Sequence, residues 1–409
     1  MKSIAIISPD TVPLLLKENH PKNIFVEGKS FDIKDKCTRA TSLGTRAWNF
    51  ALNLSKDKDL EIILYVPDIN YPGKDNIDFS NINFDIQPYN LKSATWNWSE
   101  ELDRKLKGCN FVIVQSATGV GFINASVLPS SVNVILDGYV PILVELPCSL
   151  IGYSNIYKKV FWNRFFNQYK DLLTRANCIL YANDRQLPYY EGQLFSLGKL
   201  DWSTYQFAPL LKVPYGVDIV ENRRPKIESD KLKLLWYGPI YPWYYPEKLL
   251  EDIYDLDNVT IDFIAVKHPR WNRSYNTYFK KFFDSNENKN INIVEEYCDD
   301  KLDIYNQYDA GIVLSREWLE ERYSVRGRVW DMVSRELPVF VNKKNIIFHE
   351  LEKIKDTIYP ISVTSLVDDL KNIKREDIKV SKESLYHIQE HMNWEKVTAP
   401  LLDYIKNFS

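Results

Sequence analysis

Short, continuously apolar runs alternate with helical patterns along the chain, and this alternation constrains the fold more than any other feature. Two segments, Thr45–Lys56 and Lys158–Leu173, repeat their apolar residues at the spacing of an amphipathic helix. Strands that are apolar on both faces and separated by helices are typical of a parallel sheet covered on each side. In the first half, the runs with strand character are Ser3–Ser8, Glu61–Val66, Phe111–Gln115, Asn133–Leu136 and Cys178–Ala182.

The same alternation restarts after Asn222–Lys233, a charged segment without apolar period that we interpret as a linker. A chain of 409 residues is longer than one hydrophobic core normally serves. We therefore predict an α/β protein with two doubly wound, Rossmann-like domains, residues 1–217 and 218–386. The strands expected in the second domain are Lys233–Tyr237, Val259–Val266, Ile291–Val294, Ala310–Leu314, Val339–Val341 and Ile358–Ile361.

Composition excludes several classes of protein. A net charge of −3 gives no field that would gather nucleic acid. The five cysteines are widely spaced and form no C-x-x-C pair, which favours reduced thiols in the cytoplasm. We find no H-E-x-x-H motif and no close pair among the five histidines, so we expect no metal and no cofactor. The longest apolar region, Val132–Tyr153, is broken by charged residues and prolines and is not expected to span a membrane.

One late segment, Glu320–Phe340, places two arginines at the start of an expected helix, Val329–Ser334. The guanidinium groups of Arg326 and Arg328, together with the free N–H groups of a helix N-terminus, complement a phosphate. Asp331, one turn further, could accept hydrogen bonds from ribose hydroxyls.

Two acidic residues open the same segment. Glu320 or Glu321 could accept from sugar hydroxyls. The alternative is a solvated salt-bridge network, in which Arg328 pairs with Asp331 and Glu321 pairs with Arg322 or Arg326.

The first domain offers three candidates. Gly44 lies at the start of the first helix, where a missing Cβ lets backbone N–H groups approach a ligand or simply permits a tight turn. Arg46 lies in the first turn of that helix, an unfavourable place for a cation, which favours a phosphate or carboxylate partner. Asp137 follows a strand and could act as a base or stabilise an oxocarbenium-like charge. Its alternative is a structural Asp-Gly turn.

Further candidates carry weaker signals. Lys267 and His268 follow an expected strand and could contact phosphate, although a surface loop is equally compatible. Tyr241 belongs to an aromatic cluster that could stack on a base or a sugar. Trp96 and Trp98 lie in a loop of the first domain and could contact an acceptor, with simple packing as the alternative.

The helical segment Lys158–Phe166 mixes cations with large aromatic residues. A helix of this composition can lie on a membrane surface. An amphipathic core helix is the favoured interpretation.

The segment SREWLEERYSVRGRVWDMVSRELPVF resembles the nucleotide-sugar loop of retaining, family 4 (group 1) glycosyltransferases of the GT-B fold. Further segments are similar to that family in the same order along the chain: Thr41–Trp48, Asn183–Gln186 through Leu197–Leu200, Val213–Asp218, Leu235–Ile240 and Asn393–Leu402.

The resemblance implies two Rossmann-like domains facing a cleft, with a C-terminal helix, about residues 387–409, that packs back onto the first domain. It makes Asp331 the ribose ligand, Glu321 or Glu320 the sugar ligand, and Arg326 with Arg328 the diphosphate ligands. Gly238 would lie in the donor loop. Two departures from the family are the longer spacing from Glu321 to Asp331 and the pair Arg335-Glu336, where small residues ending in glycine are expected.

The function implied is transfer of a sugar from a nucleotide diphosphate donor to a hydroxyl of a glycan, lipid-linked or other acceptor, with retention and without metal. The second domain would bind the donor and the first the acceptor. Such an enzyme of polysaccharide or glycoconjugate biosynthesis would be cytoplasmic. The alternative is a peripheral position at the inner membrane face. Alternatives are an epimerase or phosphorylase on the same fold, or a degenerate sugar- or lipid-binding module without turnover.

Overall fold

The chain folds into two compact units. The structure, a computed structural model, describes all residues except 27–28, 97–99, 116–121, 151–152, 205–208, 221–228, 242, 253–255, 265–289, 295–300, 344–355 and 409. Unit 1 comprises Met1–Leu146, Gly152–Pro214 and Val397–Ser409, and unit 2 comprises Pro147–Ile151 and Tyr215–Lys396.

The division at Pro214 lies three residues before the boundary expected from the sequence. Tyr215 packs edge-on against Trp394 of unit 2, with 5.1 Å between ring centroids. A Cβ at Gly216 would lie 2.4 Å from the same indole, so the chain passes directly over it. These two contacts attach residues 215–216 to unit 2.

Unit 1 is built on a parallel sheet of seven strands in the order β5-β4-β1-β6-β7-β8-β9. Its central strands are buried on both faces, as the continuous apolar runs predict. The strands are β1 (Lys2–Ile7), β4 (Leu60–Pro67), β5 (Asp85–Tyr89), β6 (Phe111–Gln115), β7 (Asn133–Asp137), β8 (Cys178–Tyr181) and β9 (Leu210–Lys212). A separate antiparallel hairpin pairs β2 (Asn23–Val26) with β3 (Lys29–Asp32).

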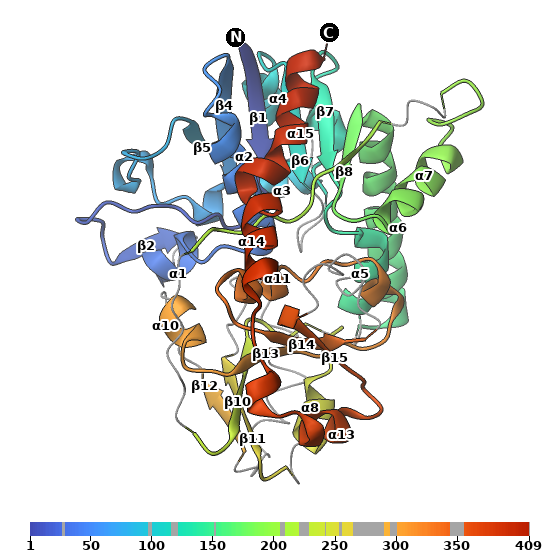
Figure 1. Cartoon of the computed structure of the whole chain (residues 1–409). Coiled ribbons are helices and arrows are strands. Elements are labelled where there is room, and N and C mark those ends of the chain that lie inside the picture. The colour runs from blue at the N-terminus through green and yellow to red at the C-terminus, as the bar shows by residue number, and fades with distance from the viewer. Residues whose placement is uncertain are drawn as a thin grey trace. The chain divides into compact units, whose positions relative to one another are not determined.

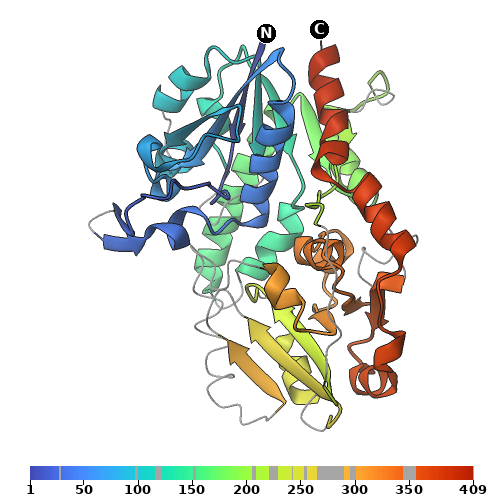
Figure 2. The ribbon, with the colours of Figure 1, turned by 60° about the vertical axis from the view of Figure 1, so that its left-hand side comes forward.

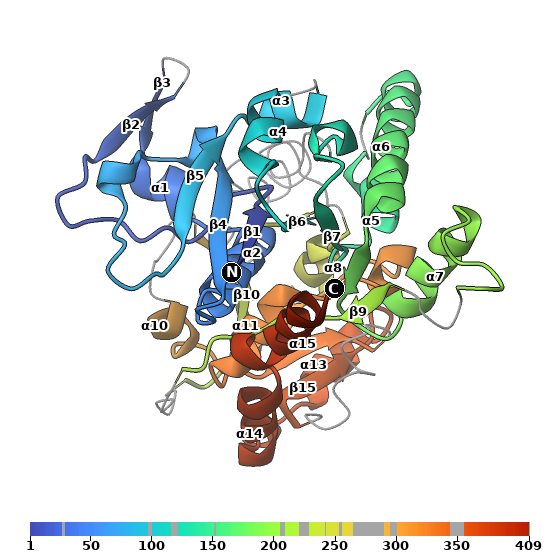
Figure 3. The ribbon, with the colours of Figure 1, turned by 90° about the horizontal axis from the view of Figure 1, so that it is seen from above.

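Helices cover both faces of this sheet, which Figure 3 shows edge-on. The α2 and α15 helices share one hydrophobic core, to which Phe50, Leu54, Leu401 and Ile405 contribute fully buried side chains. The helices of unit 1 are α1 (Ile33–Cys37), α2 (Ser42–Leu54), α3 (Leu91–Trp96), α4 (Glu100–Leu106), α6 (Asn155–Arg175) and α7 (Gln186–Ser196), with α5 (Ile142–Ser149) and α15 (Trp394–Asn407) each divided between the units.

In unit 1, hydrogen bonds from Lys2 join the N-terminal strand to the C-terminal end of the chain. Lys2 donates from Nζ to the backbone oxygens of Ile405 and Phe408, at 2.8 and 2.9 Å. Both ends therefore lie at the same edge of the unit (Figure 1 and Figure 2). Val397–Ser409 belongs to unit 1 although the residues before it belong to unit 2.

Unit 2 repeats the design with six parallel strands in the order β12-β11-β10-β13-β14-β15. Read in chain order this is 3-2-1-4-5-6, the strand order of a Rossmann domain. The strands are β10 (Leu232–Tyr237), β11 (Val259–Ile264), β12 (Ile291–Val294), β13 (Ala310–Val313), β14 (Val339–Asn342) and β15 (Ile358–Ile361), and the helices are α8 (Pro246–Asp252), α10 (Lys301–Tyr305), α11 (Gly327–Ser334), α13 (Leu366–Asn372) and α14 (Lys382–His391).

All eleven strands expected from apolar runs are present, and within the described residues their ends differ from the expected ones by two residues at most. The strands that were not predicted from the sequence are β2, β3, β5 and β9. These either lie at a sheet edge or form the small hairpin, so they carry less of the apolar signal.

Candidate functional site

The carboxyl ends of β10 and β13 mark the point in unit 2 where the strand order reverses. These two strands are neighbours, yet the chain leaves them toward opposite sides of the sheet. Open α/β sheets bind their ligands in the crevice formed at such a point. Here it is bordered by the turn after β10, which begins at Gly238, and by the chain between β13 and α11.

Gly238 has a left-handed backbone, with φ of +101°. Its N–H donates to the Ile264 carbonyl at 2.9 Å, so the chain turns sharply at the end of β10. A Cβ here would lie 3.5 Å from the guanidinium carbon of Arg328. The turn therefore presents open backbone directly beside that cation.

Arg328 lies in the first turn of α11 and reaches back to this turn. Its Nη2 donates to the Pro239 carbonyl at 2.6 Å. The guanidinium carbon is 4.4 Å from the ring centroid of Tyr244 and 5.8 Å from that of Trp236. Its Nη1 is buried and has no hydrogen-bond partner among the described residues. The geometry holds a cation at the switch point with one donor uncommitted.

Arg326 immediately precedes α11. It pairs with Glu321, as the salt-bridge alternative predicts, but the pair is buried and not solvated. It donates from Nη1 to Glu320, and from Nη2 to Glu320, Glu321 and the Ser315 hydroxyl. Both glutamates are only 1% exposed. Burial would lower the pKa of Arg326, but the charges of Glu320 and Glu321 outweigh it and hold the pKa well above its usual range.

Arg326 therefore holds the chain between β13 and α11 in place. The Ser315 N–H donates to Asn342 at the end of β14 at 2.7 Å, and Asn342 donates back to the Ser315 carbonyl at 2.9 Å. The paired carboxylates of Glu320 and Glu321 are thus anchored to two strand ends. They are bound to Arg326 and are not presented to solvent.

Asp331 is fixed one turn into α11. It accepts from the Tyr305 hydroxyl at 2.7 Å and from Nη1 of Arg335. Burial, and then the charge of Asp331, raise the pKa of Tyr305 well above its usual range, so the hydroxyl stays a donor. Arg328 makes its hydrogen bond to Pro239 and not to Asp331, so the expected i,i+3 pair does not form.

The backbone conformation at Glu336 is one that favours glycine, the residue expected at this position. Its φ is +63°, in the left-handed region. The Leu337 N–H donates to the Met332 carbonyl and the Glu336 N–H to the Val333 carbonyl, each at 3.0 Å, which is the pattern of a Schellman helix end. Glycine adopts this conformation without strain, whereas an L side chain costs roughly 1 kcal/mol.

An aromatic cluster lines the turn after β10. Tyr241 stacks on Trp243 with 4.6 Å between centroids and 16° between planes. Tyr244 lies under both arginines, 5.2 Å from the guanidinium of Arg326 and 4.4 Å from that of Arg328. The cluster thus shields the cations and leaves Tyr241 partly exposed.

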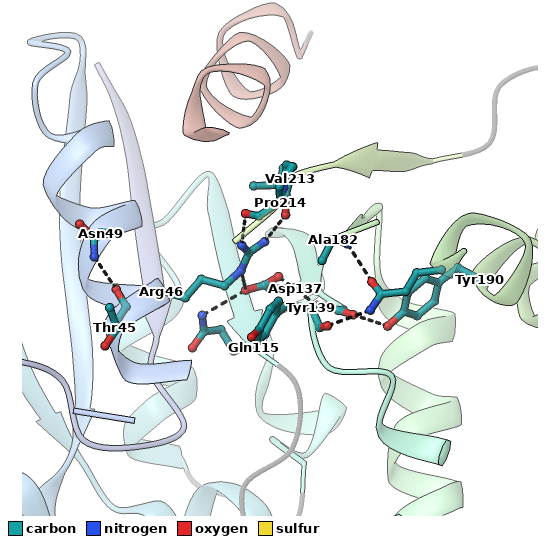
Figure 4. A network of polar contacts seen from close by, with 12 residues as sticks. Thr45, Arg46, Asn49, Gln115, Asp137, Tyr139, Ala182, Tyr190, Val213 and Pro214 are labelled. Atoms are coloured by element: carbon teal, nitrogen blue, oxygen red, sulfur yellow. Dashed lines mark hydrogen bonds and ion pairs between the residues drawn. The ribbon is translucent and has the colours of Figure 1, made fainter. Parts of the chain in front are cut away.

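In unit 1, Arg46 and Asp137 form a fully buried ion pair (Figure 4). Arg46 donates from Nε to Asp137 at 2.7 Å, and from its other nitrogens to the carbonyls of Pro214 and Val213 at 2.6 and 2.8 Å. Asp137 also accepts from Gln115 at 3.1 Å. Asp137 lies at the carboxyl end of β7, as expected, but it is a completely buried, satisfied carboxylate.

Gly44 serves a close approach of backbone. A Cβ at this position would lie 1.7 Å from the Thr11 carbonyl oxygen. Its N–H is capped by the Thr41 hydroxyl at 3.1 Å. The missing side chain therefore accommodates the protein's own loop after β1.

Four candidates lie where the structure gives no side-chain description. Lys267, His268 and Trp98 fall outside the described residues, and Trp96 is described only as the last residue of α3. The structure neither brings these residues to the site nor removes them from it.

The expectation of no metal was based on the absence of a close histidine pair, and that statement is wrong. His387 and His391 are separated by three residues and lie together on α14, with 4.6 Å between ring centroids. The sequence itself shows this spacing. Across the described ranges there is still no group of three or more His, Cys, Asp or Glu side chains that could hold a metal ion.

Several solved structures share this architecture over their full length. Sucrose-phosphate synthase from Thermosynechococcus elongatus matches with a TM-score of 0.66 at 12% identity, covering 99% of this chain and 98% of that one. HepE from Anabaena, solved in complex with UDP and glucose, matches with a TM-score of 0.61 at 8% identity over 100% of both chains. The chain has the GT-B fold.

A glycosyltransferase from Rickettsia africae ESF-5 has the same GT-B fold, with a TM-score of 0.59 at 11% identity, covering 100% of this chain and 99% of that one. No protein-family model and no curated protein sequence matches. The expected fold of two Rossmann-like domains is therefore confirmed. Function on a GT-B scaffold is decided by the residues of the site.

Proposed function

We propose that this protein is a glycosyltransferase that takes a sugar from a nucleotide diphosphate donor bound to unit 2. The observation that carries the proposal is Arg328. Its guanidinium lies beside the open backbone of Gly238, at the switch point of a Rossmann sheet, with a buried donor uncommitted. A diphosphate is the ligand class that such a cation and a helix N-terminus complement together.

Arg328 supports the transfer step through charge. In that step the bond between the anomeric carbon and the diphosphate oxygen breaks, and the diphosphate leaves with the electron pair. The acceptor hydroxyl oxygen forms the new bond to carbon, and its proton passes to the departing diphosphate. Negative charge grows on the departing diphosphate, and a preorganised cation at that position stabilises the transition state. Transfer with retention and without a metal or cofactor remains the prediction drawn from the family resemblance.

The other residues divide between recognition and support. Asp331 has one oxygen held by Tyr305 and the other by Arg335, which orients the carboxylate for ribose hydroxyls. We assign Arg326 to holding Glu320 and Glu321, because its Nη1 and Nη2 are already bonded. In unit 1, Asp137 and Arg46 support the framework on which an acceptor would bind.

Incubation with a panel of nucleotide sugars tests the proposal. HepE is solved with UDP-glucose as well as with UDP and glucose, so uridine donors come first. Release of nucleotide that increases with an added hydroxyl acceptor supports transfer. Binding of nucleotide without any turnover across the panel would instead favour a degenerate binding module. The buried Glu320–Arg326–Glu321 cluster supports this second function, because its carboxylates are bound to Arg326 and are not presented to solvent.

We also propose that α6 brings unit 1 to a membrane that holds a lipid-linked acceptor. It exposes Ile156, Val160 and Phe166, at 79%, 65% and 42%. Lys159 and Lys170 are exposed on the same side, and Asn155–Lys170 contains no acidic residue. Exposed apolar side chains among lysines suit an anionic lipid surface. In the described parts of the chain, no helix has the length and apolar character of a membrane span.

Replacing Ile156 and Val160 by glutamate together is expected to abolish cosedimentation with vesicles that contain phosphatidylglycerol. The glutamates would meet the negative surface potential and would remove the apolar contacts. Tyr386→Glu is the matched control, because Tyr386 is 64% exposed on α14, in unit 2. Equal binding of the double variant and the wild type, or binding that does not depend on anionic lipid, would refute the assignment.

A further inference from the structure

His387 and His391 stand one helical turn apart on the same side of α14. Their ring centroids are 4.6 Å apart, and the ring planes are inclined by 53°. Two imidazoles at i and i+4 can each donate a nitrogen to one metal ion. We propose that this pair binds a divalent transition-metal ion of the class that prefers imidazole, represented by Zn²⁺.

The position of the pair favours a cation. His391 is the last residue of α14, where the carbonyl groups give the helix its negative end. Two exposed carboxylates add to this charge: Glu383 lies one turn before His387, and Glu390 is next to His391. Because His391 is exposed, an ion can reach the site from solvent. Charge, access and spacing therefore agree.

The protein supplies two ligands, and water completes the coordination. No third His, Cys, Asp or Glu joins the pair within the described ranges. A structural zinc site has four protein ligands, so this site is expected to bind more weakly and to exchange its ion. Such a site responds to the concentration of the metal.

Metal binding would hold the end of α14 in helical form. An ion that joins His387 to His391 fixes the last turn, where a helix otherwise frays. The next residue, Met392, accepts through its carbonyl from the Val217 N–H at 2.8 Å. Val217 is also bridged to Asn393. The ion would thus stabilise the contacts of Val217 with Met392 and Asn393 in unit 2.

The same helix packs against α11. Its buried face carries Ser384 and Ile388, and α11 is its neighbour there. Since α11 holds Arg328, the metal would stabilise the helix that carries the candidate donor site. The metal site itself does not depend on the proposed transferase activity.

Titration of Zn²⁺ into metal-free full-length protein tests the site, with heat of binding and melting temperature as readouts. We expect one saturable ion per chain from this pair and a rise in Tm that a chelator reverses. His387→Ala and His391→Ala should each remove both effects, because one imidazole alone does not chelate. His20→Ala is the control and should keep them, since His20 lies elsewhere, in unit 1.

A relocated histidine separates chelation from histidine content. Combining His391→Ala with Gln389→His keeps the number of histidines but places them at i and i+2, which do not face each other on a helix. Loss of zinc binding in this variant supports the proposal. Retained saturable binding in it or in either single alanine variant, or no saturable binding by the wild type, overturns it. The Tm without zinc reports whether each variant is folded.

Discussion

Replacing Arg46 by methionine is expected to destabilise unit 1 by about 3–5 kcal/mol, the cost of breaking a buried ion pair by removing one partner. Asp137 would be left charged and unpaired in a site with no solvent exposure. The carbonyls of Val213 and Pro214 would also lose their donors. Urea unfolding, followed by circular dichroism, measures the change.

The control is a surface ion pair in the same unit. Lys212 and Asp184 pair at 2.6 Å with side chains 38% and 74% exposed, so Lys212→Met should cost at most about 1 kcal/mol. Adding Asp137→Leu to Arg46→Met removes the orphaned carboxylate and should recover part of the loss. An Arg46→Met protein as stable as the Lys212→Met control would contradict the buried pair.

Replacing Arg328 by methionine is expected to lower turnover of a nucleotide-sugar donor by roughly 10²–10³-fold, the typical effect of removing one preorganised charge-stabilising donor. Methionine keeps much of the volume beside Gly238 and Tyr244 but supplies no hydrogen-bond donor. The measurement is the rate of nucleotide release at saturating donor and acceptor.

Arg375→Met is the matched control for that experiment. Arg375 is a second arginine of unit 2 and pairs with Asp309 at 2.6 Å, and Asp309 precedes β13 and therefore lies at the amino end of the sheet. Its removal should leave turnover unchanged while it tests the general effect of losing a cation from unit 2. If Arg328→Met and Arg375→Met had the same rates, the role of Arg328 in transfer would be wrong.

Sequence alone was enough for the architecture because the central strands are buried on both faces. The run Phe111–Gln115 matches the buried strand β6 in full. The two edge strands of unit 1 were not predicted, for physical reasons. The β5 strand contains Asp85, Gln87 and a proline, and β9 is only three residues long and partly exposed. An edge strand needs less apolar surface, so its pattern is weak.

The site was harder to foresee because its partners are distant in sequence. Arg46 meets Asp137 across 91 positions, and Arg328 meets Pro239 across 89. No local spacing encodes such contacts. Helical spacing suggested Arg328 with Asp331, but a side chain in the first turn of a helix points back toward its N-terminus, and so toward Pro239. The histidine pair on α14, by contrast, was visible in the sequence.

Binding of a nucleoside diphosphate to the wild-type protein tests the central claim most directly. Thermal unfolding with UDP, GDP, CDP and dTDP should show a rise in Tm for at least one of them. A ligand at 100 times its Kd stabilises the folded state by about 2.7 kcal/mol. For a domain of about 150–250 residues this corresponds to roughly 5–10 °C. The rise should disappear in Arg328→Met. No response to any of the four nucleotides, or an equal response in Arg328→Met, would contradict a diphosphate site at Gly238 and Arg328.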